Sequence, residues 1–425
     1  MTDIAAYVEE LAVRAKSASH ALGFAPDEVR CAAVRAMAEV LRERADEVLE
    51  ANAADMETAR EAGTSEGLLD RLLLTPERIE GMAAGLEKLA SLPDPVGRVL
   101  DKRDISEGVH LRRVSVPLGL VAMVYEARPN VTADAAGICI RTGNACILRG
   151  GSIAQKSCAA IARILSDAVA ANGFDAAAVS IIETTDRAAT GALMSLRGVV
   201  DVLIPRGGAG LIQRCVRESL VPVIETGTGN CHTYVHASAD TAKARSIVMN
   251  AKTQRVGVCN ACESLLVDEA IAAEFLPQML SELVAAGVTI HGDAVAREAA
   301  VAADVLDSFV DARDEDWGRE YLSLDISVRA VSGLDEAIAH INRFGTGHSE
   351  CIVAGDANAC DRFLREVDAA AVYANASTRF TDGGEFGLGA EIGISTQKLH
   401  ARGPFAAEAL TTYKYELRGT GQVRP

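Results

Sequence analysis

The sequence of 425 residues predicts an α/β protein with two doubly wound domains and a small β extension. Three observations predict this fold class. Over residues 1–92, apolar positions recur every three or four residues, which is typical of helices. From residue 117 to 226, short apolar strands alternate with alanine-rich helical stretches, which indicates a parallel sheet covered by helices. After Gly229 a second alternating series of similar length begins.

The first half of the chain opens with a helical layer. Within it, Thr75, Pro76 and Glu77 form a good helix start, because proline fits the first turn and an acid favours the positive end. The predicted strands of the first sheet then follow at 119–126, 144–150, 179–183, 199–205 and 220–226. Apolar runs of this length, bounded by turn residues, are typical of strands buried on both faces.

The second half repeats this order of elements. We expect helices at 239–254, 269–287 and 334–345, with strands at 263–268, 288–292, 325–331, 350–355 and 370–376. Two further segments lie outside these cores, a hairpin-like stretch and an alternating tail. The predicted division is therefore 1–95 with 117–228 as one domain, 229–404 as the second, and 96–116 with 405–425 as an arm. The arm is either an oligomerisation element or a pair of plain surface hairpins.

The charge and the cysteines restrict the class of protein. A formal net charge of −17 repels nucleic acid phosphates and anionic membranes, although it leaves room for a local basic pocket. The ten cysteines lie mostly inside apolar segments, as reduced core thiols do. The first residues lack a signal-peptide pattern, and no run of about 18 apolar residues occurs. We therefore expect a cytoplasmic protein.

Several common motifs are absent or misplaced. The chain has neither the GxGxxG dinucleotide fingerprint nor a phosphate-loop pattern. The segment 63–67 matches a hydrolase nucleophile elbow, but it follows a helical pattern rather than a strand, so we interpret it as a helix end. Cys259 and Cys262 form a CxxC, which is compatible with a redox pair or half of a zinc site. No second pair supplies further zinc ligands, and we expect no metal.

Cys259 is the candidate nucleophile. It follows a predicted helix whose end carries Lys252 and Arg255, and cations at that position lower the pKa of a neighbouring thiol. The alternative is that Cys259 is a core residue, since it lies in an apolar run. Spacing alone leaves both interpretations open.

Five ordered segments resemble a known family. They span 124–151, 203–210, 250–267, 337–350 and 372–415. Together they resemble the γ-glutamyl phosphate reductases, which are glutamate-5-semialdehyde dehydrogenases of the aldehyde dehydrogenase superfamily. The resemblance implies an aldehyde dehydrogenase-like fold and NADPH-dependent reduction of L-glutamyl 5-phosphate to L-glutamate 5-semialdehyde and phosphate, in proline biosynthesis. It also implies that 1–95 with 117–228 is the cofactor-binding domain and 229–404 the catalytic domain.

The resemblance assigns two catalytic residues. Cys259 falls at the family's nucleophile position, where its thiolate would displace phosphate to give a thioester that hydride then reduces. Asn130 falls where these enzymes place a donor to the developing oxyanion, an interaction that contributes about 3 kcal/mol in a dry site. The alternative for Asn130 is a helix N-cap.

The resemblance also implies the cofactor site. Arg149 would meet the 2′-phosphate of NADPH through its bidentate fork, Gly207 and Gly208 would lie near the pyrophosphate at a helix start, and Glu320 would hold the nicotinamide ribose. Glu225 matches the general base that hydrolyses the thioester in oxidising relatives, a reaction that a phosphate reductase must avoid. The cofactor-binding candidates are Arg149, Gly150, Gly151, Gly207, Gly208, Glu225 and Glu320.

Substrate contacts and partners follow from the chemistry of the implied substrate. A phosphate and an α-carboxylate need cations, and the α-ammonium needs an acceptor. The candidates are Arg128, Lys252, Arg255, Ser377 and Arg379 and, more weakly, Lys398 and Arg402. His340 and His348 lie in a matched segment without evident catalytic work. A homo-oligomer and the upstream glutamate kinase are the expected protein partners.

The chain departs from the family pattern at three positions, and two rival functions stay open. Val256 stands where the family has proline, Phe344 replaces histidine or tyrosine, and Cys262 replaces an apolar residue. Cys262 would therefore be able to form a disulfide with Cys259 under oxidation. The rivals are a hydrolytic aldehyde dehydrogenase, favoured by Glu225, and a redox-sensing protein in which the two cysteines cycle.

Overall fold

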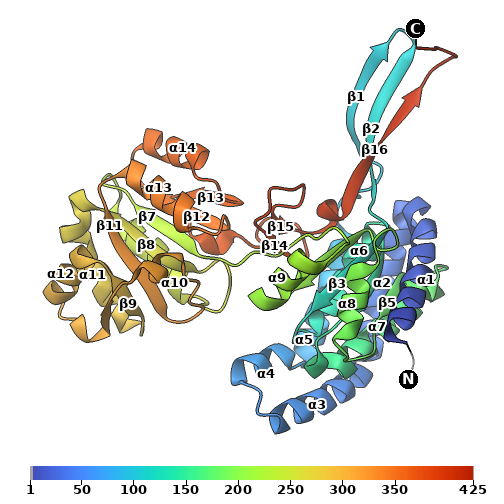
Figure 1. The fold of residues 1–425 in the computed structure, drawn as a ribbon, viewed down its shortest axis with the longest axis horizontal. Coiled ribbons are helices and arrows are strands. Elements are labelled where there is room, and N and C mark those ends of the chain that lie inside the picture. The colour runs from blue at the N-terminus through green and yellow to red at the C-terminus, as the bar shows by residue number, and fades with distance from the viewer. Residues whose placement is uncertain (1–2, 425) are drawn as a thin grey trace. The chain divides into compact units, whose positions relative to one another are not determined.

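A computed structural model describes residues 3–424, and the chain divides into two compact units (Figure 1). Unit 1 contains the described residues up to Thr226, the short segment Gly387–Gly393 and the chain from Phe405 onward. Unit 2 contains Gly227–Phe386 and Ile394–Pro404. The first boundary therefore lies two residues from the one that the sequence predicts. Among the described residues, no helix has the length and hydropathy needed to span a membrane.

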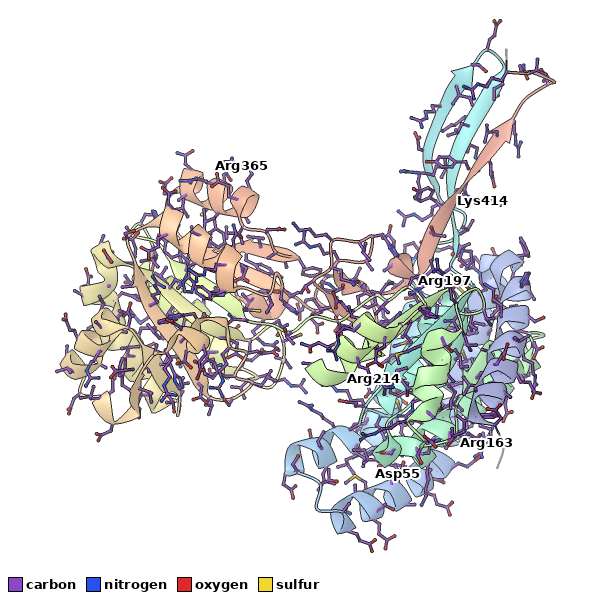
Figure 2. All side chains as sticks on the ribbon, in the orientation of Figure 1. Asp55, Arg163, Arg197, Arg214, Arg365 and Lys414 are labelled. Atoms are coloured by element: carbon purple, nitrogen blue, oxygen red, sulfur yellow. The ribbon has the colours of Figure 1, made fainter. Side chains whose placement is uncertain are left out.

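Unit 1 begins with the expected helical layer. Its helices are α1 (Ile4–Phe24), α2 (Asp27–Glu43), α3 (Ala45–Glu61), α4 (Glu66–Leu72) and α5 (Pro76–Ala90). The predicted start of α5 is confirmed, because Thr75 Oγ1 accepts the amide of Arg78 at 3.2 Å. Asp55 of α3, labelled in Figure 2, accepts the Ser157 amide at 2.8 Å and its hydroxyl at 2.7 Å, which joins this layer to the sheet domain.

The sheet of unit 1 is parallel, with the strand order β5-β4-β3-β6. Its strands are β3 (Leu120–Tyr125), β4 (Ala145–Arg149), β5 (Val179–Ile181) and β6 (Val202–Arg206), and its helices are α6 (Asn130–Arg141), α7 (Gln155–Ala171), α8 (Ala188–Ser195) and α9 (Ala209–Glu218). The predicted strand at 220–226 is wrong. Only an isolated bridge joins Val223 to Leu203, and Pro222 has no amide hydrogen with which to extend the ladder.

The predicted hairpin and tail form one antiparallel sheet, which we call the arm. It consists of β1 (Val99–Ser106), β2 (Val109–Pro117) and β16 (Thr411–Arg418), in the order β1-β2-β16. Figure 1 shows the arm projecting from the helices of unit 1. Val99 pairs with Val114 on one side of β2, and Leu417 pairs with Leu111 on the other.

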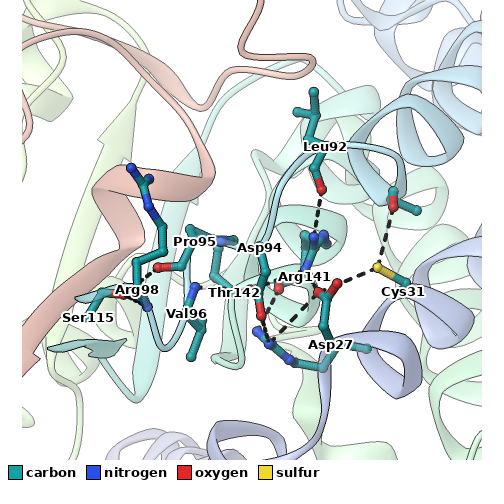
Figure 3. Close-up of polar contacts among 12 residues, drawn as sticks. Asp27, Cys31, Leu92, Asp94, Pro95, Val96, Arg98, Ser115, Arg141 and Thr142 are labelled. Atoms are coloured by element: carbon teal, nitrogen blue, oxygen red, sulfur yellow. Dashed lines mark hydrogen bonds and ion pairs between the residues drawn. The ribbon is translucent and has the colours of Figure 1, made fainter. Parts of the chain in front are cut away.

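Two arginines fix the root of the arm (Figure 3). Arg141 forms ion pairs with Asp27 and Asp94 and donates to the Leu92 carbonyl at 2.7 Å. Arg30 pairs with Asp94 at 2.7 Å. Both arginines are at least 98% buried, and the linker that they hold leads directly into β1. Two guanidiniums and two carboxylates therefore balance one another at this position.

Unit 2 is a seven-stranded parallel sheet with the order β10-β9-β11-β8-β7-β12-β13. Its strands are β7 (Cys231–Val235), β8 (Cys262–Asp268), β9 (Thr289–Gly292), β10 (Phe309–Asp311), β11 (Asp325–Val331), β12 (Ser349–Val353) and β13 (Ala371–Ala374). Its helices are α10 (Thr241–Thr253), α11 (Glu269–Ala285), α12 (Ala294–Ala302), α13 (Leu334–Phe344) and α14 (Ala357–Glu366). The chain passes between the units again in the short strands β14 (Gly393–Ser395) and β15 (Gly403–Phe405).

Candidate active site

Cys259 lies in unit 2, in the turn between the end of α10 and the start of β8. It is half-buried, whereas the other nine cysteines are all buried. Burial raises the pKa of Cys262 to about 11, and the Cys262 thiol donates to the Ser264 carbonyl at 3.3 Å. Because a thiolate is the reactive form, the accessible Cys259 is the thiol that this site offers to a ligand.

The backbone of Cys259 is held closely from the strand beside it. The thiol of Cys231 donates to the Cys259 carbonyl at 3.1 Å. A Cβ atom on Gly229 would lie 1.5 Å from the same carbonyl oxygen, so no residue larger than glycine fits there without moving the nucleophile. The sequence did not single out Gly229, because its role depends on a contact made across 30 positions.

Asn260 ties the nucleophile turn to the segment that carries Arg379. Its side-chain amide donates to the Thr381 carbonyl at 2.8 Å, and its own carbonyl accepts from the Thr378 hydroxyl at 2.8 Å. Ser377 caps this segment by accepting the amide of Arg379 at 3.3 Å. The position of Arg379 relative to Cys259 is therefore determined by hydrogen bonds on both sides of the segment.

Arg255 and Arg379 form a pair of like charges beside Cys259. Burial and the Arg255 guanidinium lower the pKa of Arg379, while the Asp382 carboxylate and, to a smaller extent, the Cys259 thiol act in the opposite direction. Arg379 donates to the Gln254 side chain at 2.8 Å, and within residues 3–424 neither arginine forms an ion pair with a carboxylate. Two guanidiniums with one nearby carboxylate, that of Asp382, leave a net positive charge, and such a charge next to a thiol stabilises its thiolate and attracts an anion.

Three of the remaining substrate candidates lie in unit 2 and form ion pairs with carboxylates instead. Lys252 is fully buried, and its ammonium forms an ion pair with the Glu263 carboxylate at 2.6 Å. Because a fully buried, paired ammonium does not reach a ligand, the expectation that Lys252 contacts the substrate is wrong. Lys398 and Arg402 both pair with Asp368. Arg128 belongs to unit 1, in the short segment before α6, and its contact with the substrate stays a prediction. The structure therefore brings together Arg255, Ser377 and Arg379 around Cys259.

Glu320, the predicted ribose ligand, lies in unit 2 and contacts the frame of the nucleophile. Its Oε1 accepts the Gly229 amide at 2.7 Å. Burial raises the pKa of Glu320, and the hydrogen bond from Gly229 opposes that effect. The carboxylate is half-buried, which leaves part of it accessible to a ligand.

Arg149 occupies the end of β4 in unit 1, and no acid in the described part of the chain pairs with it. It is 9% exposed and donates to the carbonyls of Gly150, at 3.0 Å, and Thr185, at 3.1 Å. Its buried Nε has no hydrogen-bond partner among the described residues. Burial lowers the pKa of Arg149, and the Arg187 charge adds to this effect. A buried, unbalanced guanidinium is the residue type that recognises a phosphate.

The start of α9 already holds an anionic group. The Gly208 amide donates to the Glu126 carboxylate at 2.9 Å, and Gly207 lies against the same side chain. Helix N-termini bind anions through their free amides, so this carboxylate stands where a phosphate is expected. The sequence alone did not identify Glu126 as a site residue, although an acid at the end of the predicted strand that became β3 could have indicated it. Gly150 and Gly151 follow β4, and Glu225 lies half-buried one residue before the boundary of unit 1.

Asn130 is the first residue of α6, and its side-chain amide donates to Asp134 at 3.1 Å. Burial raises the pKa of the Asp134 carboxyl to about 6. The N-cap position belongs to Pro129, which contradicts the alternative that Asn130 caps the helix. Asn130 belongs to unit 1 and Cys259 to unit 2, and their pairing at an oxyanion stays a prediction.

The two histidines of the matched signature are buried in unit 2. Burial lowers the pKa of His340 to about 3 and that of His348 to about 4, so both are neutral at physiological pH. In the described part of the chain, the hydrogen bond of Arg379 goes to Gln254 and not to either histidine. Across residues 3–424, no three histidine, cysteine or acidic side chains gather as metal ligands would.

Comparison with known proteins gives a consistent assignment. The aldehyde dehydrogenase family model matches residues 3–303. A γ-glutamyl phosphate reductase of Thermobifida fusca is 51% identical over the full length of both chains, and one of Moorella thermoacetica is 52% identical over 99% of this chain and 100% of its own. The crystal structure of γ-glutamyl phosphate reductase from Thermotoga maritima has a TM-score of 0.95 at 45% identity, covering 98% of this chain and 100% of that one.

A more distant structure supports the fold alone. An acetylating aldehyde dehydrogenase of Geobacillus thermoglucosidasius is 20% identical and has a TM-score of 0.69 over the full length of both chains. The predicted aldehyde dehydrogenase-like α/β fold is thereby confirmed. The chain belongs to the aldehyde dehydrogenase family of oxidoreductases and, within it, to the γ-glutamyl phosphate reductases.

Proposed function

We propose that this enzyme reduces L-glutamyl 5-phosphate with NADPH to L-glutamate 5-semialdehyde and phosphate, through a thioester on Cys259, as a step of proline biosynthesis. The observation that carries the proposal is the pair of arginines, Arg255 and Arg379, beside the accessible thiol. Neither has a carboxylate partner within residues 3–424, and together they suit a dianionic phosphate. The names of the relatives support the same substrate.

The acyl transfer follows from the residues around the thiol. The Cys259 thiolate attacks the acyl carbon, a carbon–sulfur bond forms, and the carbon–oxygen bond to phosphate breaks. Arg255 and Arg379 neutralise the charge on the departing phosphate, and Ser377 keeps Arg379 oriented by capping its segment. Asn130 would donate to the oxyanion that develops on the acyl oxygen. Phosphate leaves readily, so this step needs no activated water.

Most of the residues that we propose for cofactor binding belong to unit 1. Arg149 fits the 2′-phosphate, because it is buried and no acid pairs with it among the described residues. The amides of Gly207 and Gly208 would hold the pyrophosphate in place of the Glu126 carboxylate, beside Gly150 and Gly151. Glu320 would bind the nicotinamide ribose. When bound, NADPH supplies the hydride that reduces the thioester carbon.

The position of Glu225 matches that of the general base in hydrolytic relatives. In the proposed reaction, a water activated there would hydrolyse the thioester to the acid before hydride transfer. We therefore assign Glu225 to the cofactor side of the site rather than to catalysis.

We further propose that the arm assembles the enzyme into a homo-oligomer. Along β16, Tyr413, Tyr415 and Leu417 are each about half exposed, and an unpaired strand edge with apolar side chains favours association. Near the root of the arm, a cavity of 480 Å³ lies beside Phe24 of α1, which is 86% exposed. The glutamate kinase that makes the labile acyl phosphate is a candidate partner in the cytoplasm.

The reverse reaction tests the proposed function. With glutamate 5-semialdehyde and NADP⁺, we expect NADPH to accumulate only when inorganic phosphate or arsenate is present, and Cys259→Ser to abolish the activity. Oxidation that proceeds equally without phosphate would replace the proposal with the hydrolytic aldehyde dehydrogenase. A lack of turnover together with a reversible Cys259–Cys262 disulfide in thiol titration would favour the redox sensor.

A further inference from the structure

The loop that carries Glu320 is fixed at three successive residues. Glu320 accepts the amide of Gly229 at 2.7 Å, and the Tyr321 hydroxyl donates to Asp316 at 3.0 Å. The amide of Leu322 donates to Glu263 Oε1 at 3.2 Å. Hydrogen bonds at three successive residues restrict the conformations of this loop, and this restriction helps to place the Glu320 side chain accurately.

The backbone of this loop has an unfavourable conformation at Leu322. Its φ is 56°, in the left-handed region that a leucine rarely adopts. The acceptor that holds its amide is Glu263, whose other oxygen binds Lys252 at 2.6 Å, and both members of this ion pair are fully buried. The pair therefore presents a fixed carboxylate oxygen to a strained amide.

The opposite end of the chain of contacts is the nucleophile. Gly229 packs so closely against Cys259 that a Cβ atom would lie 1.5 Å from its carbonyl oxygen. The next residue, Asn230, is fully buried and donates to the carbonyls of Trp317, at 2.9 Å, and Phe344, at 3.0 Å. Because Gly229 and Cys259 are in direct contact, the position of Gly229 restricts that of Cys259, and Glu320 in turn holds the Gly229 amide.

We propose that Glu320 is a positioning residue for Cys259, acting through the Gly229 amide, and that the buried Lys252–Glu263 pair holds Glu320 in place through the Leu322 amide. This inference deepens the proposed function at the same site and rests on Cys259 as its nucleophile. It gives Lys252 a structural task in place of a substrate contact. Without the contact from Glu320, Gly229 and Cys259 shift relative to Arg255 and Arg379, and the thiolate loses their stabilisation.

The test compares Glu320→Gln with Glu320→Ala in the absence of cofactor and substrate. Both variants remove the same negative charge, but only glutamine keeps an oxygen that accepts the Gly229 amide. The readout is the rate of Cys259 alkylation by iodoacetamide as a function of pH, with the modified peptide identified by mass spectrometry. Because the other nine cysteines are buried, alkylation of the folded enzyme reports on Cys259.

We expect Glu320→Gln to react at nearly the rate of the unmodified enzyme, and Glu320→Ala to react roughly five- to tenfold more slowly with its pH profile moved to higher pH. Glu336→Ala is the matched control. Glu336 also holds a backbone amide, that of Ser332 at 2.9 Å, but it has no contact with the Cys259 frame. Equal rates for the Glu320 alanine and glutamine variants would overturn the proposal, as would an equal loss in the control.

A second pair of variants tests the other half of the proposal. Lys252→Met with Glu263→Gln removes the ion pair but keeps an acceptor for the Leu322 amide, whereas Lys252→Met with Glu263→Leu removes both. We expect only the leucine combination to slow alkylation to the rate of Glu320→Ala. Equal rates in these two would refute the role of Glu263. The Glu320 comparison stands on its own if the leucine combination fails to fold.

These measurements separate this inference from the proposed function. Alkylation needs neither the acyl phosphate nor NADPH, so a different substrate would leave the predicted order of rates unchanged. In steady-state assays, Glu320→Gln should raise mainly the KM for NADPH, while Glu320→Ala should also lower kcat. Identical changes in both constants would mean that Glu320 acts on the ribose alone.

Discussion

Two pairs of arginines in this enzyme have opposite surroundings. At the root of the arm in unit 1, Arg30 and Arg141 are buried against Asp27 and Asp94, and each guanidinium has a carboxylate partner (Figure 3). Beside Cys259 in unit 2, Arg255 and Arg379 lie near each other without a carboxylate partner in residues 3–424. The paired charges at the root of the arm hold a linker in place. The net positive charge beside Cys259 suits the binding of an anion.

In this chain, a structural arginine pairs directly with a carboxylate, whereas a functional arginine forms no such ion pair among the described residues. Two positive groups held together disfavour each other's charged form, and the partial burial of Arg379 adds to this effect. A bound anion would offset it. Arg149 meets the same criterion in unit 1, since it is buried and, among the described residues, it donates to carbonyls and forms no ion pair with an acid.

The largest expected effect comes from removing an unbalanced arginine. Arg379→Ala should lower kcat/KM for phosphate in the reverse reaction by about 10²- to 10³-fold, because a charge-assisted bidentate contact is lost. Arg379→Lys keeps the charge without the fork and should lose roughly tenfold. The thermal midpoint should hardly change. An unaltered KM for phosphate in both variants would contradict the assignment.

The balanced pair should behave in the opposite way. Arg141→Ala removes the partner of Asp27 and should lower the free energy of unfolding of unit 1 by about 2 kcal/mol, a value reduced because the two carboxylates are partly exposed. Chemical denaturation followed by circular dichroism measures this change. Activity per folded molecule should be preserved. A large loss of kcat with unchanged stability would contradict the assignment of Arg141 to a structural role.

Arg149 should affect the choice of cofactor. Arg149→Gln removes the positive charge that we assign to the 2′-phosphate, so kcat/KM with NADPH should fall about tenfold while that with NADH stays within about twofold. Steady-state kinetics with both cofactors checks the ratio. Equal losses with both would indicate that Arg149 supports β4 rather than the phosphate.

The smallest effect is expected at Cys262. Its pKa of about 11 keeps it protonated near neutral pH, and its thiol is buried against the Ser264 carbonyl. Cys262→Ala should therefore change kcat/KM by less than about twofold and lower stability by about 1 kcal/mol through a small cavity. A loss comparable to that of Cys259→Ser would mean that the two cysteines work as a pair.

The fold was largely predictable because its signals are local. The alternation of apolar strands and helices predicts both parallel sheets, and the polar alternation at 96–117 predicts the hairpin of the arm. The strand expected at 220–226 fails because proline interrupts its hydrogen bonding and the segment meets β6 at a single residue.

The site was predictable only in part. Cys259 and Arg255 are close in sequence, so their spacing indicates chemistry. Lys252 has the same local context, but its partner Glu263 lies on the next strand and turns it into a buried ion pair. The contacts of Gly229, Asn260 and Glu126 depend on segments that meet only in the folded chain, so no pattern in the sequence predicts them.

A pre-steady-state experiment tests the central claim most directly, namely that Cys259 forms a thioester that phosphate releases. The enzyme is mixed with glutamate 5-semialdehyde and NADP⁺ without phosphate, and NADPH absorbance is followed in a stopped-flow instrument. We predict a burst equal to the concentration of Cys259 sites, then no further turnover until phosphate is added. Continuous NADPH formation without phosphate, or turnover on phosphate addition without any preceding burst, would contradict the account.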